Sequence, residues 1–143
     1  MPISGTDRQI NLTPLFALVL AACAAPVARN DEITTPLAAA GDPARGRAIF
    51  TARAGGHCVL CHAAPGVEVG GNVGPSLAGV GARLTEGQIR LRVADISRVK
   101  PDAAMPSFHR VDGLARVAPE YLGRPVLDGR QVEDVVAWLA TLR

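Results

Sequence analysis

Residues 58–62 read Cys58-Val59-Leu60-Cys61-His62, a CxxCH pentapeptide in which two thiols stand one helical turn apart and an imidazole follows directly. Each thiol of such a pair can add across a haem vinyl group, and the histidine can then bind the iron. The chain has only three cysteines and three histidines, and three of these six residues fall in this window. The stretch therefore predicts one covalently bound haem c (iron), attached through Cys58 and Cys61, with His62 as an iron ligand.

Two other uses of the same residues fit the sequence less well. A thiol–disulfide exchange CxxC belongs in a βαβ context, and no such context surrounds residues 58–61. A zinc site built on two cysteines and a histidine lacks a fourth ligand at the usual second-pair spacing.

Composition agrees with a domain built around a cofactor. The 143 residues include only three Phe, one Tyr and one Trp, with 15 Gly and 11 Pro. A small domain with so few large side chains struggles to bury enough apolar surface, and a porphyrin supplies that surface. Net charge is +2, and Lys100 is the sole lysine among 15 cations. So weak a charge with few aromatics is typical of ordinary surface, and no nucleic-acid partner is expected.

The start of the chain is predicted to be a targeting segment over residues 1–28. Arg8 gives a weak positive start, and an apolar run from Leu15 to Ala25 is too short for a permanent membrane span. Export to the periplasm fits the cofactor. Leu20-Ala21-Ala22-Cys23 matches a lipobox, so the membrane is a partner only if Cys23 is lipidated; ordinary cleavage after Ala24 or Ala28 is the alternative. Residues 29–41 are predicted to be an extended leader or tether, and residues 42–143 the folded domain.

Helix signals lie at both ends of that domain. Asp42 is suited to cap a helix, with Pro43 at its first position and Gly55-Gly56 at its end. Asp128 and Gln131 form a capping-box pattern ahead of the last helix. That helix has the clearest periodic stripe, formed by Val132, Val135, Val136, Leu139 and Leu142. Trp138 at its edge is predicted to pack on the Gly46–Phe50 face of the first helix.

A middle helix is also predicted, and no alternating strand pattern of useful length occurs. Thr85 and Gln88 form a second capping-box pair before Ile89, Val93 and Ile96, and Pro101 is expected to stop the helix. The domain is therefore predicted to be all-α, with helices and long loops wrapped around one haem.

The second axial ligand is less certain from sequence than the first. Met105 is the only methionine of the expected mature chain, and Pro106 fixes the backbone behind it. His109 and an open site are the alternatives; His57, adjacent to Cys58, cannot reach across the porphyrin. A thioether favours ferrous iron and raises the reduction potential, so Met105 as ligand predicts electron transfer.

A Gly-Pro turn over residues 74–79, Gly74-Pro75-Ser76-Leu77-Ala78-Gly79, follows the CxxCH motif. An iron-bound imidazole needs its other ring nitrogen anchored, and a rigid turn can present a backbone carbonyl for that purpose. Leu77 is placed to pack on the porphyrin.

Taken together, these residues resemble the class I c-type cytochromes, and more closely the SoxX family, the small monohaem subunits of bacterial SoxAX cytochromes. The resemblance covers most of residues 42–143. It is carried by GNVGPSLAGVGARL at 71–84, AMPSF at 104–108, GRPVL at 123–127 and VEDVVAWLATL at 132–142. It implies a class I cytochrome c-like fold, and that the Pro75 carbonyl accepts the His62 ring proton.

The same resemblance implies a function and a set of partners. The chain would pair with a larger SoxA-like cytochrome subunit in a thiosulfate-oxidising enzyme, an L-cysteine S-thiosulfotransferase. That complex joins thiosulfate to a cysteine of the SoxYZ carrier. The chain would relay the electrons to a small soluble cytochrome c, and would supply no catalytic acid, base or nucleophile of its own.

Residues 107–127 give a physical reason to expect a partner. This loop is longer than the connection requires and carries Phe108, Leu114, Val117, Tyr121 and Leu122. Apolar content outside a periodic helix predicts an interface; packing over the haem edge is the alternative. A free-standing class I cytochrome c shuttle and a haem sensor with a labile sixth position are the competing functional hypotheses.

Overall fold

Every regular element in the described part of the chain is a helix. The computed structural model describes Met1, residues 31–53 and residues 55–143, so the predicted targeting segment beyond Met1, Cys23 included, lies outside the described residues. The elements are α1 (Pro43–Thr51), α2 (Cys58–Cys61), α3 (Val80–Arg83), α4 (Glu86–Ala94), η1 (Ile96–Arg98), η2 (Pro119–Tyr121) and α5 (Gly129–Thr141), the two η elements being 3₁₀ turns. The predicted all-α fold is confirmed. No helix among these residues is long and apolar enough to cross a bilayer.

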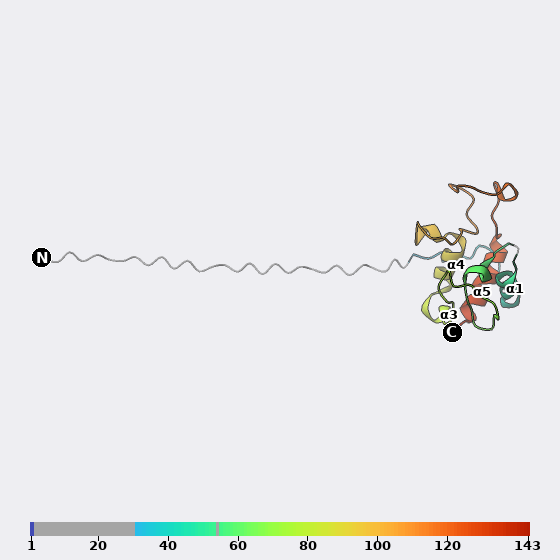
Figure 1. Ribbon diagram of the computed structural model, residues 1–143, viewed down its shortest axis with the longest axis horizontal. Coiled ribbons are helices and arrows are strands. Elements are labelled where there is room, and N and C mark those ends of the chain that lie inside the picture. Colours follow the sequence, from blue (N-terminus) through green and yellow to red (C-terminus); the bar gives the residue numbers. More distant parts are fainter. Residues whose placement is uncertain (2–30, 54) are drawn as a thin grey trace.

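Helices α1 and α5 bring the two ends of the domain together (Figure 1). The rings of Phe50 and Trp138 lie with centroids 4.7 Å apart at 50°. A Cβ at Gly46 would overlap the backbone carbonyl of Asp134 and lie 2.9 Å from Cβ of Trp138. The helices can therefore cross this closely only because position 46 has no side chain. The predicted packing of Trp138 on the Gly46–Phe50 face is confirmed.

The apolar stripe of α5 forms the centre of the core. Both predicted capping boxes are present: Asp128 with Gln131 begins α5, and Thr85 with Gln88 begins α4. A capping box satisfies backbone donors that a helix start leaves unpaired. The side chains buried around α5 include Phe50, Ile89, Val93, Leu127, Val132, Val135, Val136 and Leu139.

Helix α1 ends earlier than predicted, at Thr51 and not at Gly55-Gly56. The Thr51 hydroxyl donates back to the carbonyl of Arg47 at 3.0 Å, and Ala52 is already extended. The chain must leave the helix here because α2 begins only a few residues later, at Cys58.

Helix α4 also ends earlier than predicted, at Ala94, so Ile96 lies in the 3₁₀ turn η1 and Pro101 is not the stop. The residue responsible is Asp95, whose carboxylate accepts hydrogen bonds from Ser97 and, at 2.7 Å, from Ser107. Short polar side chains that bond locally in this way compete with helical hydrogen bonding.

The leader segment 31–41 has no regular secondary structure, and hydrogen bonds dock it on the domain. The Ile33 amide donates to the Gly87 carbonyl at 3.0 Å, and the Leu37 amide donates to the Glu133 carboxylate at 2.9 Å. Arg90 donates to the Ile33 carbonyl at 2.7 Å and forms an ion pair with Glu133 at 2.6 Å. One buried ion pair thus joins α4, α5 and the leader.

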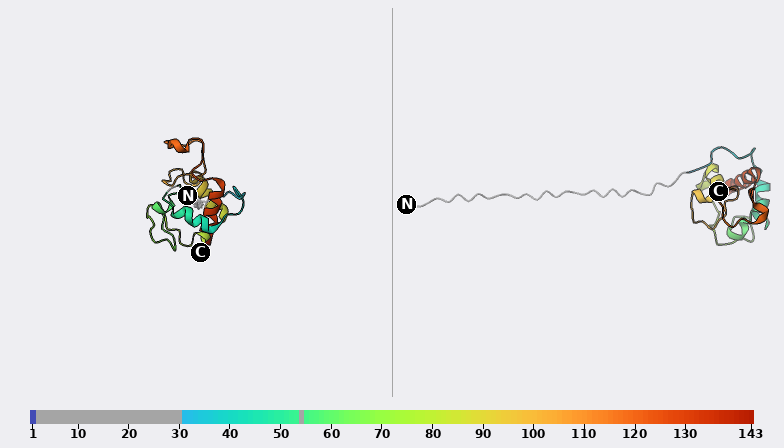
Figure 2. Two further views of the ribbon diagram at one scale, coloured as in Figure 1. Left: turned by 90° about the vertical axis from the view of Figure 1, so that its right-hand side faces the viewer. Right: turned by 90° about the horizontal axis from the view of Figure 1, so that it is seen from above.

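Residues 110–124, which include η2, leave the body of the domain as a projecting loop (Figures 1 and 2). Phe108, predicted to belong to an apolar interface loop, is buried in the core instead. Its amide bonds to the Val93 carbonyl, and the Leu127 amide bonds to the Phe108 carbonyl at 2.9 Å. These bonds close the base of the projecting loop on α4.

Candidate haem site

The short helix α2 holds both cysteines of the CxxCH motif one turn apart. His57 begins α2 in the left-handed region at φ 53°, and His62 ends it in an extended conformation with its amide bonded to the Cys58 carbonyl at 2.9 Å. The Cys58 and Cys61 thiols are free of any disulfide. Burial raises the pKa of Cys58 to about 11, so this sulfur stays a protonated thiol at neutral pH.

The alternatives for these residues gain no support from the site. Among the residues that the structure describes, no group of three or more His, Cys, Asp or Glu side chains could hold a metal ion. The sulfurs are therefore arranged for covalent attachment to a prosthetic group, with Cys58 partly buried against the apolar core.

Only one of the two ring nitrogens of His62 is hydrogen-bonded to the described part of the protein. Its Nδ1 lies 2.8 Å from the carbonyl oxygen of Pro75. A carbonyl oxygen can only accept, so Nδ1 carries the proton and Nε2 keeps a free lone pair. A Cβ at Gly74 would stand 2.7 Å from Nδ1 and 2.8 Å from Nε2, so the ring lies directly against a glycine.

Backbone hydrogen bonds fasten the 70–77 loop to the CxxCH segment. The Gly71 amide donates to the Val59 carbonyl at 2.9 Å, and the Gly74 amide donates to the Cys61 carbonyl at 2.8 Å. The Leu77 amide donates to the carbonyl of Ala63, directly after the motif, at 2.9 Å. The loop therefore moves with α2, and the Pro75 carbonyl is held at a constant position relative to His62. The carbonyl anchor was predicted from the Gly-Pro turn, whereas these three backbone bonds were not, although the glycine-rich run 70–74 was a signal for close backbone approach.

Leu77 and Met105 reach the same apolar cluster as Cys58. All three are partly buried and pack against the core centred on α5. α2, the Gly-Pro turn and the loop after η1 thus each contribute a side chain to the surface of this core. His57 is exposed, at the start of α2.

His109 occupies a different structural position from Met105. Its Nδ1 lies 2.9 Å from the Leu127 carbonyl, and its amide donates to the Ala94 carbonyl at 3.0 Å. These contacts tie the two ends of the projecting loop to α4. The set available to a prosthetic group is therefore two thiols, an imidazole with Nε2 unengaged, a thioether and an apolar wall, and this set fits haem c.

Comparison with known proteins identifies the class. The family model for cytochrome c matches residues 43–143. The chain belongs to the cytochrome c family, with one covalently bound haem c and its iron as cofactor.

Two relatives place it within that family. A chain in the crystal structure of SoxXA from P. pantotrophus has 38% sequence identity and a TM-score of 0.71, with 79% of this chain and 90% of that chain covered. A cytochrome c-553-like protein of Synechocystis sp. (strain ATCC 27184 / PCC 6803 / Kazusa) is 42% identical over 57 residues. The match spans 40% of this chain and only 48% of the Synechocystis protein, about half its length. These likenesses make the chain a class I cytochrome of the SoxX type, as the sequence indicated.

Proposed function

We propose that the chain is the electron-accepting monohaem subunit of a thiosulfate-oxidising SoxAX-type complex, bound to a larger SoxA-like cytochrome subunit. The observation that carries this is the 38% identity over 90% of a chain from a SoxXA crystal structure. In the proposed reaction, thiosulfate and a SoxYZ cysteine thiol form a sulfur–sulfur bond and release two electrons and one proton. The chain accepts these electrons singly and passes them to a small soluble cytochrome c.

Each site residue has one proposed role. When bound, haem c supplies a one-electron ferric–ferrous couple. Cys58 and Cys61 would hold it covalently, His62 would ligate the iron through Nε2, and Met105 would supply the second iron ligand. The Pro75 carbonyl keeps the His62 proton on Nδ1, at the observed 2.8 Å, and Leu77 supplies apolar contact. None of these residues acts as a catalytic acid, base or nucleophile.

Contacts in the fold favour Met105 over His109 as the second ligand. The thioether of Met105 is partly buried against the core and forms no hydrogen bond with the described part of the chain. His109 is bonded through its ring and its amide to Leu127 and Ala94, which close the loop base. A thioether ligand raises the reduction potential, as an electron acceptor requires.

The exported form of the chain is proposed to begin upstream of Glu32. Glu32 accepts a hydrogen bond from the Thr85 hydroxyl at 2.6 Å, and Ile33 pairs with Gly87. Cleavage after Ala24 or Ala28, or lipidation at Cys23, would keep both contacts in the periplasmic protein. Residues 1–28 remain the proposed targeting segment.

Reconstitution tests the proposed function. The purified holoprotein is mixed with thiosulfate alone, and then with a SoxA-like subunit and SoxYZ added singly and together. Haem reduction, followed optically, is expected only when both proteins are present. Reduction by thiosulfate alone, or none with the full set, contradicts the proposal.

One observation favours a free-standing electron shuttle as the second candidate. Leu60, inside the CxxCH motif, is 46% exposed; Val73, in the 70–77 loop, is 71% exposed, and Val69, just before that loop, is 68% exposed. Apolar side chains exposed beside the haem attachment suit brief docking of a redox protein. A shuttle stays monomeric when mixed with a SoxA-like subunit in sedimentation analysis, whereas a subunit forms a stable heterodimer.

A further inference from the structure

A cavity of about 300 Å³ lies between the projecting loop and the segment that follows Met105. Its walls come from two parts of the chain that are separated by the buried Phe108. The lining includes Pro106, Arg110, Leu114, Arg116, Tyr121 and Arg124. The haem site described above uses none of these residues, although Pro106 is the direct neighbour of Met105.

The charged side chains that line this loop cavity are all arginines. Arg110 is already engaged: it donates to the Ser97 hydroxyl at 2.7 Å and lies 3.7 Å from the Asp95 carboxylate. Arg124 donates from Nε to the Glu120 carbonyl, and neither Arg116 nor Arg124 forms an ion pair with a carboxylate in the described part of the chain. Two positive charges at the cavity therefore have no internal counter-charge.

The rest of the lining is mainly apolar. Leu114 is 39% exposed, and the half-buried Val117, Tyr121 and Val126 stand beside it. Arg116 adopts a φ of 58°, in the left-handed region that side chains other than glycine and asparagine seldom occupy. A strained backbone position of this kind is found most often where a segment binds something.

We propose that the loop cavity receives an acidic segment of the SoxA-like partner, with an apolar side chain inside and carboxylates paired with Arg116 and Arg124. This inference rests on the proposed function for the identity of the partner. A free oxyanion fits less well, because the cavity is lined mostly by apolar atoms. Docking here places the partner beside Pro106, on the Met105 side of the domain.

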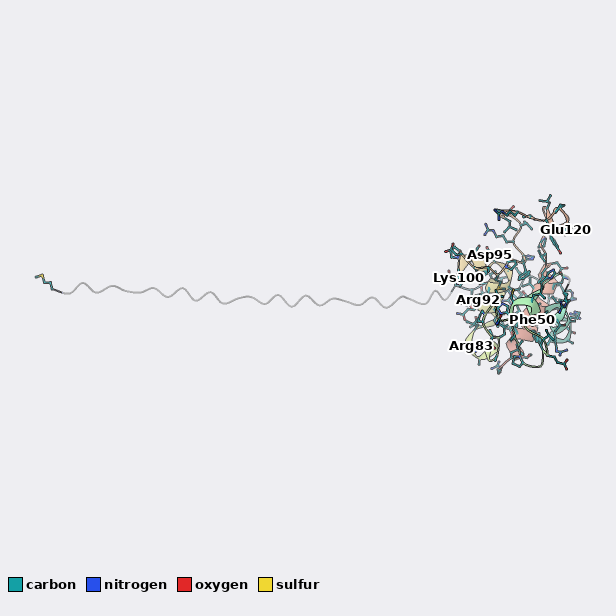
Figure 3. The ribbon with its side chains drawn as sticks, viewed as in Figure 1. Phe50, Arg83, Arg92, Asp95, Lys100 and Glu120 are labelled. Carbon is teal, nitrogen blue, oxygen red and sulfur yellow. The ribbon has the colours of Figure 1, made fainter. Side chains whose placement is uncertain are left out.

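Charge reversal tests the proposal with a matched control. Arg116→Glu/Arg124→Glu is compared with Arg83→Glu/Arg143→Glu, which changes the charge equally at the end of the molecule opposite the loop. Figure 3 labels Arg83 at that end and Glu120 on the loop, and Figure 1 marks the C-terminus, where Arg143 lies. Binding of each holoprotein to the SoxA-like subunit is measured by calorimetry at low and high salt. The loop variant is expected to raise the Kd at least about tenfold at low salt, and less at high salt, with the control within about twofold.

The outcomes separate the two proposals. A Kd unchanged in the loop variant, beside a wild type that binds, overturns the cavity proposal and leaves the proposed function standing. A wild type that does not bind the subunit overturns the proposed function and the cavity proposal with it. Thiosulfate alone is also titrated into the wild type and the loop variant. If the wild type binds thiosulfate and the loop variant does not, the cavity is a free-anion site and the proposal of a partner segment is overturned. An unchanged haem spectrum verifies that each variant is folded.

Discussion

His62 and Pro75 are joined by a hydrogen bond of 2.8 Å between the ring Nδ1 and the backbone carbonyl oxygen. The bond links a residue of the CxxCH motif to a turn that three backbone hydrogen bonds fasten to the same segment. Position and tautomer of the imidazole are therefore both set by the backbone. Because Gly74 has no side chain, the His62 ring can come this close to the turn.

Gly74→Ala should disturb this arrangement. The new methyl group would overlap the His62 ring, so either the ring rotates or the turn moves off its anchor. We expect the free energy of unfolding of the holoprotein to fall by about 1–3 kcal/mol, and the ferric haem spectrum to change. Ser76→Ala, at an exposed position of the same turn, is the control. An unaltered spectrum and stability in Gly74→Ala would show that the turn adapts without affecting the ring.

Met105→Ala tests the second axial ligand. Loss of a sulfur–iron bond should abolish the weak long-wavelength absorption band of the oxidised protein and lower the reduction potential, since thioether ligation raises it. His109→Ala is the matched comparison, expected to keep the band while loosening the loop that His109 ties to Leu127. The assignment is reversed if His109→Ala loses the native axial ligation and Met105→Ala does not.

The sequence predicted those parts of the fold that depend on local or strongly periodic signals. Asp128, Gln131, Thr85 and Gln88 act through bonds across one helical turn, so their pattern is visible in the chain itself. The contact of Trp138 with α1 could be predicted too, because a glycine four residues before an aromatic residue lets another helix approach closely on that face. The His62 anchor was accessible for a similar reason: iron-bound imidazoles need one.

What could not be predicted depends on contacts between distant residues. The Asp95 carboxylate at the end of α4 accepts one hydrogen bond from the nearby Ser97 and a second from Ser107 in a later loop, and no local pattern reveals the second. Residues 31–41 resemble a linker in composition, yet Arg90 and Glu133 hold them against the domain. Phe108 was assigned to a surface loop because no period marks it, although backbone bonds to Val93 and Leu127 draw it into the core.

Gly46→Ala tests the crossing of α1 and α5. A methyl group at this position would overlap the Asp134 carbonyl, and neither helix backbone can yield as a flexible side chain would. We expect a loss of about 1–3 kcal/mol in the free energy of unfolding, measured with urea. Ala48→Ser, an exposed change in the same helix, should cost less than about 0.7 kcal/mol through helix propensity alone. If the free energy of unfolding falls equally in the two variants, the close crossing of α1 and α5 is not the cause.

Asp134 should make stability dependent on pH in the acid range. Hydrogen bonding from Arg45 lowers the pKa of Asp134 below its ordinary 3.8, against the raising effect of burial. A group whose folded pKa is lowered stabilises the fold above its unfolded pKa, and that contribution is lost as pH falls through the folded pKa. Unfolding by urea should therefore show a drop in stability below about pH 4. In Asp134→Asn that drop should be smaller and stability at neutral pH lower by about 1–3 kcal/mol; the exposed Asp102→Asn serves as control.

Arg90→Ala should be the most destabilising of these changes. The side chains of Arg90 and Glu133 are 4% and 5% exposed, so removing the guanidinium leaves a carboxylate buried without its counter-charge. Breaking such a pair costs about 3–5 kcal/mol. The Ile33 carbonyl loses its donor as well, so residues 31–41 should become sensitive to limited proteolysis. Arg92→Ala, two positions along α4, removes only a bond to the Gln88 carbonyl of the same helix and should change stability by about 0.5 kcal/mol or less. If the leader stays protected in Arg90→Ala, Leu37 and Glu32 suffice to hold it, and the ion pair stabilises only the contact between α4 and α5.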